Sequence, residues 1–213
     1  MINVHFFTFN GFQENTYILS DQTKECVIID PGCYSNQEQQ ELTHYITSNE
    51  LIPVKLLNTH GHIDHVLGNN FVASTYNIGL EMHEKDLPTL HATPAYGTTY
   101  GFNIDPSPEP STLLEEGDVV QFGNSELEVL FTPGHSAGHI VFVSHKDQFV
   151  INGDVLFRGS IGRTDLPGGD YNTLIESIKT KLMTLPENYV VYTGHGGSTT
   201  IGFEKNNNPF LNQ

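Results

Sequence analysis

The residues best able to do chemistry lie in one short segment, residues 59–65, with the sequence THGHIDH. Burying its three imidazoles and one carboxylate without a shared partner would be costly. His60 and His62 can present their rings to one cation, while Asp64 and His65 can turn toward a second. Imidazole and carboxylate ligands together suit zinc, and they also accept iron or manganese. The segment therefore predicts a metal site.

Three more residues of the same types lie downstream, each beside a glycine or a turn after an apolar run. They are His135 in TPGHS, Asp154 in NGD and His195 in TGHG. One cation would not use all of these groups, whereas two cations sharing a carboxylate and a solvent oxygen need about this many ligands. Two metals about 3.5–4 Å apart can lower the pKa of a bridging water toward 7 and polarise a carbonyl. The complete set predicts a binuclear centre for hydrolysis.

The apolar pattern predicts elements that would bring these residues together. The strands are expected at residues 4–9, 16–19, 26–29, 54–57, 80–83, 119–122, 127–131, 140–143, 149–151 and 190–192. The helices are expected at residues 36–49, 67–76, 84–91 and 174–185. The metal-binding segment directly follows a buried strand. Two β-rich halves with helices outside predict an α+β fold, a four-layer αββα sandwich.

One segment, residues 92–111, interrupts this pattern. It is rich in proline and carries three aromatic side chains, Tyr96, Tyr100 and Phe102. A long loop inside a compact domain usually has a function. We therefore expect an active-site loop at residues 92–111, with its aromatic side chains at the mouth of the site. The chain is expected to form a single domain over residues 1–213.

The charge of the chain restricts its partners. With 9 Lys+Arg against 25 Asp+Glu, the formal net charge is −16. This balance argues against binding to nucleic acid or to an anionic membrane surface. We expect a small-molecule substrate instead. No feature of the sequence indicates an oligomeric state.

The cellular location is predicted from the cysteines and from the absence of long apolar runs. Cys26 and Cys33 are the only two cysteines, which excludes a disulfide framework and favours a reducing compartment. No apolar run approaches the ~18 residues of a transmembrane helix, and the N-terminus lacks the features of a signal peptide. We expect a soluble cytoplasmic protein.

Two charged residues outside the metal set are candidates for supporting roles. Asp30, in the turn Asp-Pro-Gly, either holds the ligand loop by hydrogen bonds or only shapes that turn. Arg163 lies on a glycine-rich loop and either binds a substrate carboxylate or pairs with a neighbouring aspartate. Structural or surface roles are expected for the remaining histidines, His5, His44, His83, His91, His139 and His145.

The combined pattern resembles the metallo-β-lactamase-fold hydrolase family. The metal motif, Asp30 and the three downstream ligands all match that family. Several short segments are similar to its glyoxalase II-like (hydroxyacylglutathione hydrolase-like) branch, and the last two to its small single-domain members. They are residues 132–135 (TPGH), 153–154 (GD), 162–165 (GRTD), 194–196 (GHG), 202–205 (GFEK) and 208–210 (NPF).

The resemblance implies an αββα fold and a specific distribution of ligands. One metal would be bound by His60, His62 and His135, the other by Asp64, His65 and His195, with Asp154 bridging the two. Glyoxalase II enzymes also carry a C-terminal helical domain that helps to hold the glutathione part of a thioester. Only 18 residues follow His195 in this chain. The fold and the metal site are therefore expected, whereas the thiol part of the substrate is left open.

The predicted mechanism follows from the two metals. A hydroxide bridging them would attack the carbonyl carbon of a thioester or ester, and a metal would stabilise the developing oxyanion. Asp64 is a candidate catalytic residue that orients this hydroxide as well as binding metal. One alternative is a persulfide dioxygenase with a single iron on His60, His62, His135 and Asp154, which would not need His195. A lactonase, a β-lactamase or another ester hydrolase would differ only in the substrate pocket.

Overall fold

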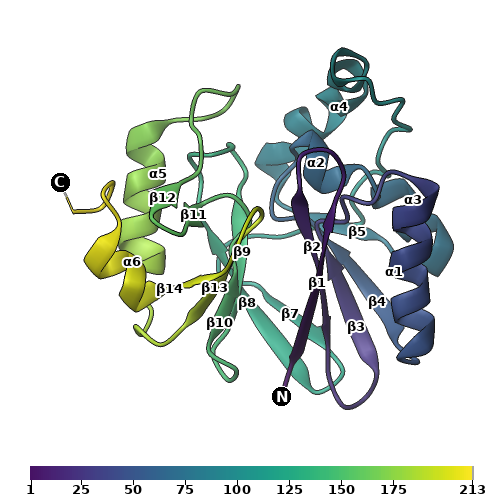
Figure 1. Ribbon diagram of the computed structural model, residues 1–213, viewed down its shortest axis with the longest axis horizontal. Helices are drawn as coiled ribbons and strands as arrows, with labels where there is room; N and C mark the ends of the chain where they lie inside the picture. Colours follow the sequence, from purple (N-terminus) through teal and green to yellow (C-terminus); the bar gives the residue numbers. More distant parts are fainter. Residues whose placement is uncertain (213) are drawn as a thin grey trace.

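The computed structural model describes residues 1–212, which form two facing β-sheets with helices on both outer faces (Figure 1). The first sheet contains six strands, in the order β1-β2-β3-β4-β5-β6. Their bounds are β1 (Asn3–Phe9), β2 (Glu14–Ser20), β3 (Glu25–Ile29), β4 (Ile52–Leu57), β5 (Leu80–Met82) and β6 (Thr112–Leu113). The first three strands pair antiparallel, and β3 to β6 run parallel. The sheet is therefore mixed.

The second sheet also has six strands, in the order β14-β13-β10-β9-β8-β7. Their bounds are β7 (Val119–Phe122), β8 (Ser125–Phe131), β9 (Ile140–Ser144), β10 (Phe149–Ile151), β13 (Val190–Tyr192) and β14 (Thr199–Thr200). Only β10 and β13 pair in parallel. A small separate hairpin is formed by β11 (Leu156–Phe157) and β12 (Ser160–Ile161).

Helices cover the outer face of each sheet, with α1 and α3 over the first sheet and α5 and α6 over the second (Figure 1). Over the first half lie α1 (Asn36–Ser48), α2 (Ile63–Val66), α3 (Asn69–Tyr76), the short 3₁₀ turn η1 (Glu84–Asp86) and α4 (Leu87–Tyr100). Over the second half lie α5 (Tyr171–Ser177), its π-helical continuation η2 (Ile178–Leu182) and α6 (Ile201–Asn207). The start of α1 is set by a capping box between Ser35 and Glu38.

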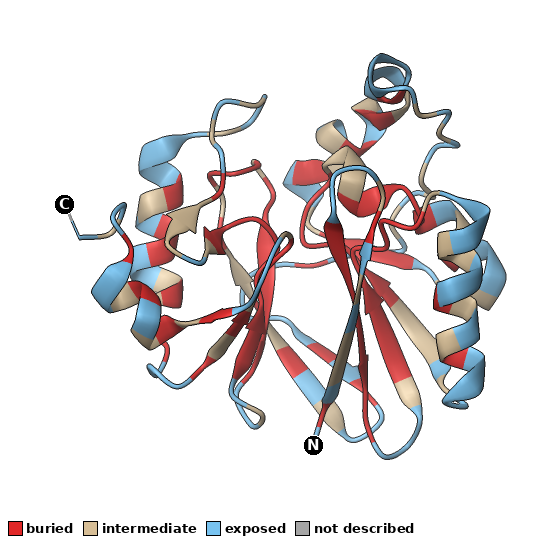
Figure 2. Ribbon diagram, viewed as in Figure 1, coloured by how far each residue is buried: buried red, intermediate tan, exposed pale blue. Residues whose placement is uncertain are grey.

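Buried apolar side chains form three core clusters. Figure 2 shows that long stretches of the central strands are buried. Successive residues of a strand point to opposite faces. In β2, Tyr17 and Leu19 therefore join the core between the sheets, while Ile18 joins the core under α1. In β9, Phe142 lies between the sheets and Val143 packs in the core that contains α5. The predicted four-layer αββα sandwich of the metallo-β-lactamase fold is confirmed.

The prediction of a loop at residues 92–111 is wrong for the first half of that segment. Helix α4 continues to Tyr100, and Gly101 ends it in a left-handed conformation with φ of 81°. Proline and glycine usually interrupt a helix, yet Pro94 lies inside α4. A proline costs a helix one hydrogen bond and bends it, but tertiary packing can outweigh that cost. Residues 101–111 are irregular, as predicted.

Each predicted strand and helix overlaps an observed one, but several short elements were missed. These are α2, β6, β11, β12, β14 and α6, of which the longest has seven residues. Helix α6 is short, and its N-cap is Thr200, whose hydroxyl accepts a hydrogen bond from the Phe203 N–H. Within residues 1–212, no helix is both long enough and apolar enough to span a lipid bilayer.

Candidate metal centre

Five of the seven predicted metal ligands lie on loops at one edge of the sandwich, and the other two, Asp64 and His65, lie in the short helix α2. Residues 58–62 follow β4, residues 132–139 connect β8 to β9, and the segments that carry Asp154 and His195 follow β10 and β13. The pairing directions bring these strand ends to a common edge. The Ile140 N–H donates to the Thr59 carbonyl at 2.9 Å and links the two sheets there. The fold thus collects residues that are up to 135 positions apart in the chain.

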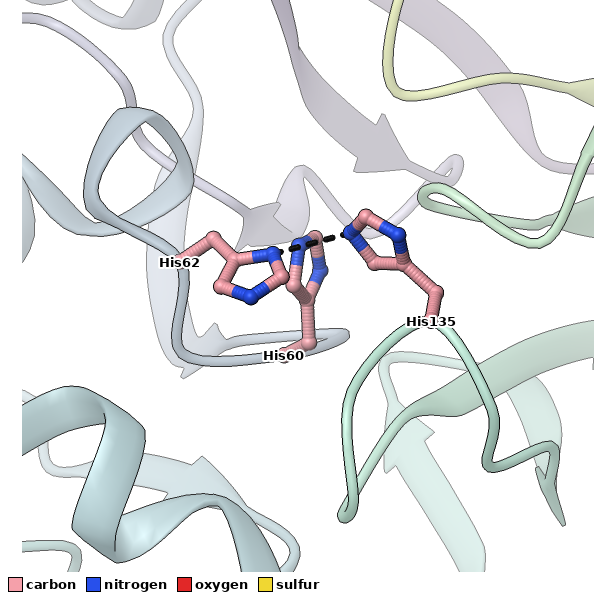
Figure 3. A group of neighbouring side chains, drawn as sticks. All are labelled: His60, His62 and His135. Carbon is pink, nitrogen blue, oxygen red and sulfur yellow. Dashed lines mark hydrogen bonds between the residues drawn. The ribbon is translucent and has the colours of Figure 1, made fainter. Parts of the chain in front are cut away.

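The first group consists of His60, His62 and His135, named here the three-histidine group. One nitrogen from each ring lies within 4.8 Å of the others. The three rings converge on one point from two separate loops (Figure 3). His62 Nδ1 and His135 Nε2 are only 2.8 Å apart. Two imidazole nitrogens this close need a shared proton or a shared metal.

The second group consists of Asp64, His65 and His195, named here the mixed group, whose ligand atoms also lie within 4.8 Å of one another. His195 Nε2 lies 3.1 Å from Asp64 Oδ2. Asp154 stands between the two groups. Its Oδ1 lies 3.6 Å from His65 Nε2, and its Oδ2 lies 3.6 Å from His135 Nε2. A carboxylate in this position can serve both groups.

The donors fit bound metal ions. His60 Nε2, His65 Nε2 and Asp154 Oδ1 are fully buried and have no hydrogen-bond partner among the described residues. Buried polar atoms without partners are rare and need an explanation. Two cations, one in each group, would satisfy all three atoms, and this set of nitrogen and carboxylate donors suits divalent metals.

The pKa values of the histidines differ between the two groups. Burial, reinforced by the neighbouring imidazoles, holds the pKa of His60 well below its usual value and lowers the pKa of His62 to about 3. These rings are neutral, as metal ligands must be. For His195, burial lowers the pKa, but hydrogen bonds to Asp154 and Asp64 outweigh this effect and raise it to about 10. A proton therefore competes with a metal in the mixed group.

Asp30 holds the ligand loop in place through hydrogen bonds. Its carboxylate accepts hydrogen bonds from the Thr59 N–H at 2.7 Å and from the Thr59 hydroxyl at 2.6 Å. It also lies 3.1 Å from His65 Nδ1, which leaves Nε2 of that ring to face the mixed group. Asp30 has a positive φ of 50°, so its turn is strained as well as polar. The sequence left these two roles open, and the structure contains both.

Two buried residues of the site were missed by the sequence analysis. His139 was expected to be structural, but its Nε2 accepts a hydrogen bond from the Asp154 N–H at 3.1 Å, and its ring stacks on His60. Asp86 contacts both ligand loops through its carboxylate. The only available signal for His139 was its position four residues after His135. No local signal pointed to Asp86.

A cleft of about 770 Å³ opens over the two groups. Its walls carry aromatic side chains from both sides, among them Phe12, Tyr96, Tyr100 and Phe157. Arg163 also lines the cleft, where its guanidinium makes a bidentate pair with Asp165 at 2.7 and 2.8 Å. Phe102 lies outside this lining and packs on Phe12 and Tyr34. The cleft is wide enough for a small molecule with an extended arm.

The fold agrees with comparisons to known proteins. A family model described as the metallo-beta-lactamase superfamily matches residues 9–195, and the chain belongs to that superfamily. It is 39% identical to hydroxyacylglutathione hydrolase GloC of Haemophilus influenzae, over 99% of both chains.

Two solved structures are similar over nearly the whole chain. The BLEG-1 B3 metallo-beta-lactamase is 35% identical with a TM-score of 0.91, covering 99% of this chain and 100% of that one. TTHA1623 in a di-iron-bound form is 38% identical with a TM-score of 0.86, covering 97% and 100%. The chain is therefore a metallo-hydrolase of this fold, with a site of the binuclear type.

Proposed function

We propose that this protein is a binuclear metal-dependent hydrolase of thioesters, with hydroxyacyl thioesters of glutathione as its substrates. The observation that carries the proposal is the pair of ligand groups with Asp154 between them. The full-length similarity to a hydroxyacylglutathione hydrolase supports the choice of substrate. We expect the protein to act on this small molecule in the cytoplasm, without nucleic-acid or membrane partners.

The three-histidine group would hold one divalent ion and the mixed group the other, and Asp154, which lies between the groups, could serve both. Zinc suits these ligands, and iron or manganese would also be accepted. Such ions supply two effects when bound: they lower the pKa of a water toward 7 and they polarise a carbonyl oxygen. The protein's task is to hold the ligands, exclude competing water and orient the thioester.

Individual side chains have distinct tasks. Asp64 lines the cleft and would orient the attacking water toward the carbonyl carbon in addition to binding metal. A thiolate is already a good leaving group, so no strong general acid is required. Arg163, at the wall of the same cleft, would bind a carboxylate of the glutathione arm and exchange its pair with Asp165 for the substrate.

The test is hydrolysis of S-lactoylglutathione by the metal-loaded protein, followed at the thioester absorbance. We expect turnover that a chelator abolishes and added metal restores. The variant Arg163→Ala should raise KM about tenfold while kcat changes little, because the lost contact binds substrate and transition state alike. Its control is Arg158→Ala, since Arg158 lies 4.7 Å from the Phe203 ring, outside the cleft. No thioester turnover with full metal would overturn the proposal.

A second candidate is hydrolysis of a β-lactam ring, which uses the same attack on a carbonyl. It is favoured by the similarity to a B3 metallo-beta-lactamase at a TM-score of 0.91. A chromogenic cephalosporin tests it directly. Faster turnover of the cephalosporin than of the glutathione thioester would support this candidate over the first.

A further inference from the structure

We propose that Asp86 is a positioning residue that sets the distance between the two loops of the three-histidine group, and so sets that group's metal affinity. The inference rests on metal binding by the proposed hydrolase. Asp86 lies at the junction of η1 and α4, outside the predicted ligand set. It is completely buried. A buried carboxylate must be satisfied by several donors, and the donors identify its task.

Every donor to Asp86 comes from a ligand loop. The Gly61 N–H, between His60 and His62, donates to Oδ2 at 2.6 Å. The Ser136 hydroxyl, next to His135, donates to the same oxygen at 3.0 Å. The Gly138 N–H donates to Oδ1 at 2.8 Å. One side chain therefore connects the loop after β4 with the loop between β8 and β9.

Two glycines let Asp86 come this close. A side chain at Gly61 would place its Cβ 3.0 Å from the Asp86 carbonyl and 2.9 Å from the Leu90 amide. A side chain at Gly138 would place its Cβ 2.4 Å from the Asp86 amide. The atoms that these side chains would clash with belong to the backbone, so no side-chain rotation can relieve the clash. The loops and the start of α4 thus fit together only without these side chains.

The pattern of hydrogen bonds requires a carboxylate at position 86. Its two oxygens accept three hydrogen bonds, two from backbone N–H groups on different loops. An asparagine has a single acceptor oxygen, and its NH₂ group would face one of those N–H donors. Asp86→Asn should therefore release one loop while preserving the size of the side chain.

This contact differs from that of Asp30. Asp30 bonds Thr59 and His65, so it acts on one loop and on a ring of the mixed group. Asp86 acts on the two loops of the three-histidine group. Supporting residues of this kind typically change metal affinity by about 10–100-fold. Loss of Asp86 should thus affect the two metal groups unequally, whereas a general loss of stability would affect both.

The experiment is a titration of the metal-free protein with Co²⁺, followed by its visible absorption. His195→Ala and His62→Ala serve as references, because each leaves one group complete and gives the spectrum of that group. We expect Asp86→Asn to weaken binding at the three-histidine group by about 10–100-fold and at the mixed group by less than about threefold. Equal weakening of both groups, or no weakening, would overturn the proposal.

A matched control is Asp21→Asn. Asp21 is also a buried acid that joins two segments, accepting from Thr23, Asn124 and Ser125, but at the opposite end of the sandwich. We expect it to lower thermal stability and to leave both Co²⁺ affinities unchanged. If it weakens the three-histidine group as Asp86→Asn does, the assigned role of Asp86 is wrong.

A milder variant keeps the test decisive if Asp86→Asn does not fold. Ser136→Ala removes one of the three donors and should weaken only the three-histidine group, by about threefold to tenfold. An unchanged affinity would count against the proposal. The titration does not need turnover: a protein that binds two Co²⁺ ions but cleaves no thioester would refute the proposed function alone.

Discussion

Among single residues, four of the five histidine ligands have one ring nitrogen occupied by a protein partner, which leaves the other nitrogen for a metal. His135 Nδ1 donates to the Arg163 carbonyl at 2.8 Å, and His195 Nδ1 donates to the Phe12 carbonyl at 3.1 Å. His60 Nδ1 lies 3.0 Å from the Thr59 hydroxyl oxygen. Hydrogen bonds of this kind fix the tautomer and the ring orientation before a metal arrives.

Asp30→Asn tests this arrangement at His65. The amide can still accept from Thr59, but it can no longer accept all the bonds that the carboxylate accepts from Thr59 and His65. We expect metal affinity at the mixed group to fall by about 10–100-fold, measured by competition with a chromophoric chelator. Asp147→Asn is the control, because Asp147 accepts from the Ile2 N–H far from the site. An unchanged affinity in Asp30→Asn would contradict the role of Asp30.

The sequence was sufficient to predict the seven candidate ligands and the supporting residue Asp30, but not the other residues that support the ligands. The ligands are recognisable because each is a metal-binding side chain beside a glycine or a turn. Asp86 has no such signature, since its partners Gly61 and Gly138 lie 25 and 52 positions away and become neighbours only through the fold. His139 is equally inconspicuous, because its contact with Asp154 forms across two strands.

At the scale of elements, glycines allow the ligand loops to pack against neighbouring helices. Gly134 precedes His135 with φ of 128°, a conformation that other residues rarely adopt. A Cβ at this position would lie 2.3 Å from the Leu174 backbone nitrogen in α5. Any other residue at position 134 would therefore have a strained backbone and a side chain that overlaps α5.

Gly134→Ala should lower the free energy of unfolding by at least about 2 kcal/mol, because α5 and the His135 loop cannot both keep their positions. The measurement is denaturant unfolding of the metal-free protein. The control is Gly117→Ala, which also has a positive φ, of 84°, but meets nothing within 4 Å. It should cost only about 1 kcal/mol. Equal costs at the two glycines would refute the packing argument.

Comparing the predicted with the observed helices and strands shows which of them a local sequence pattern can predict. Nearly continuous apolar runs predict buried strands such as β9, because both faces of each sheet are covered. Helix α4 was cut short because its continuation past Pro94 depends on packing, for example of the buried Thr93 and Gly97, which no local pattern reveals. The short strands β11 and β12 have two residues each, too few to show a period.

At the scale of the whole molecule, the two halves are joined at both ends of the sandwich. At the metal end, Asp86 and the Ile140–Thr59 bond link them. At the other end, Asp21 of the β2–β3 turn accepts from the β7–β8 turn, through the Asn124 N–H and the Ser125 hydroxyl. The halves are therefore held in register independently of the metal ligands.

The contribution of Asp21 should depend on pH. Burial opposes its ionisation, but hydrogen bonds from Thr23, Asn124 and Ser125 outweigh that effect and lower its pKa from 3.8 to about 2. A lowered folded-state pKa adds stability above the unfolded-state pKa, and this stability is lost as the pH falls toward the folded value. We expect Asp21→Asn to cost about 1–3 kcal/mol at pH 7. The difference from the parent protein should shrink between pH 4 and pH 2, as measured by unfolding at each pH. A difference that stays constant over this range would rule out ionisation as its source.

The two ligand groups should bind two metal ions per chain, and counting the bound ions tests this. Elemental analysis of protein purified without added metal should find close to two divalent ions in the parent protein. His195→Ala should retain close to one, because it disrupts the mixed group and leaves the three-histidine group with Asp154 intact. A single ion in the parent protein that His195→Ala does not remove would contradict the binuclear centre and favour a mononuclear iron enzyme.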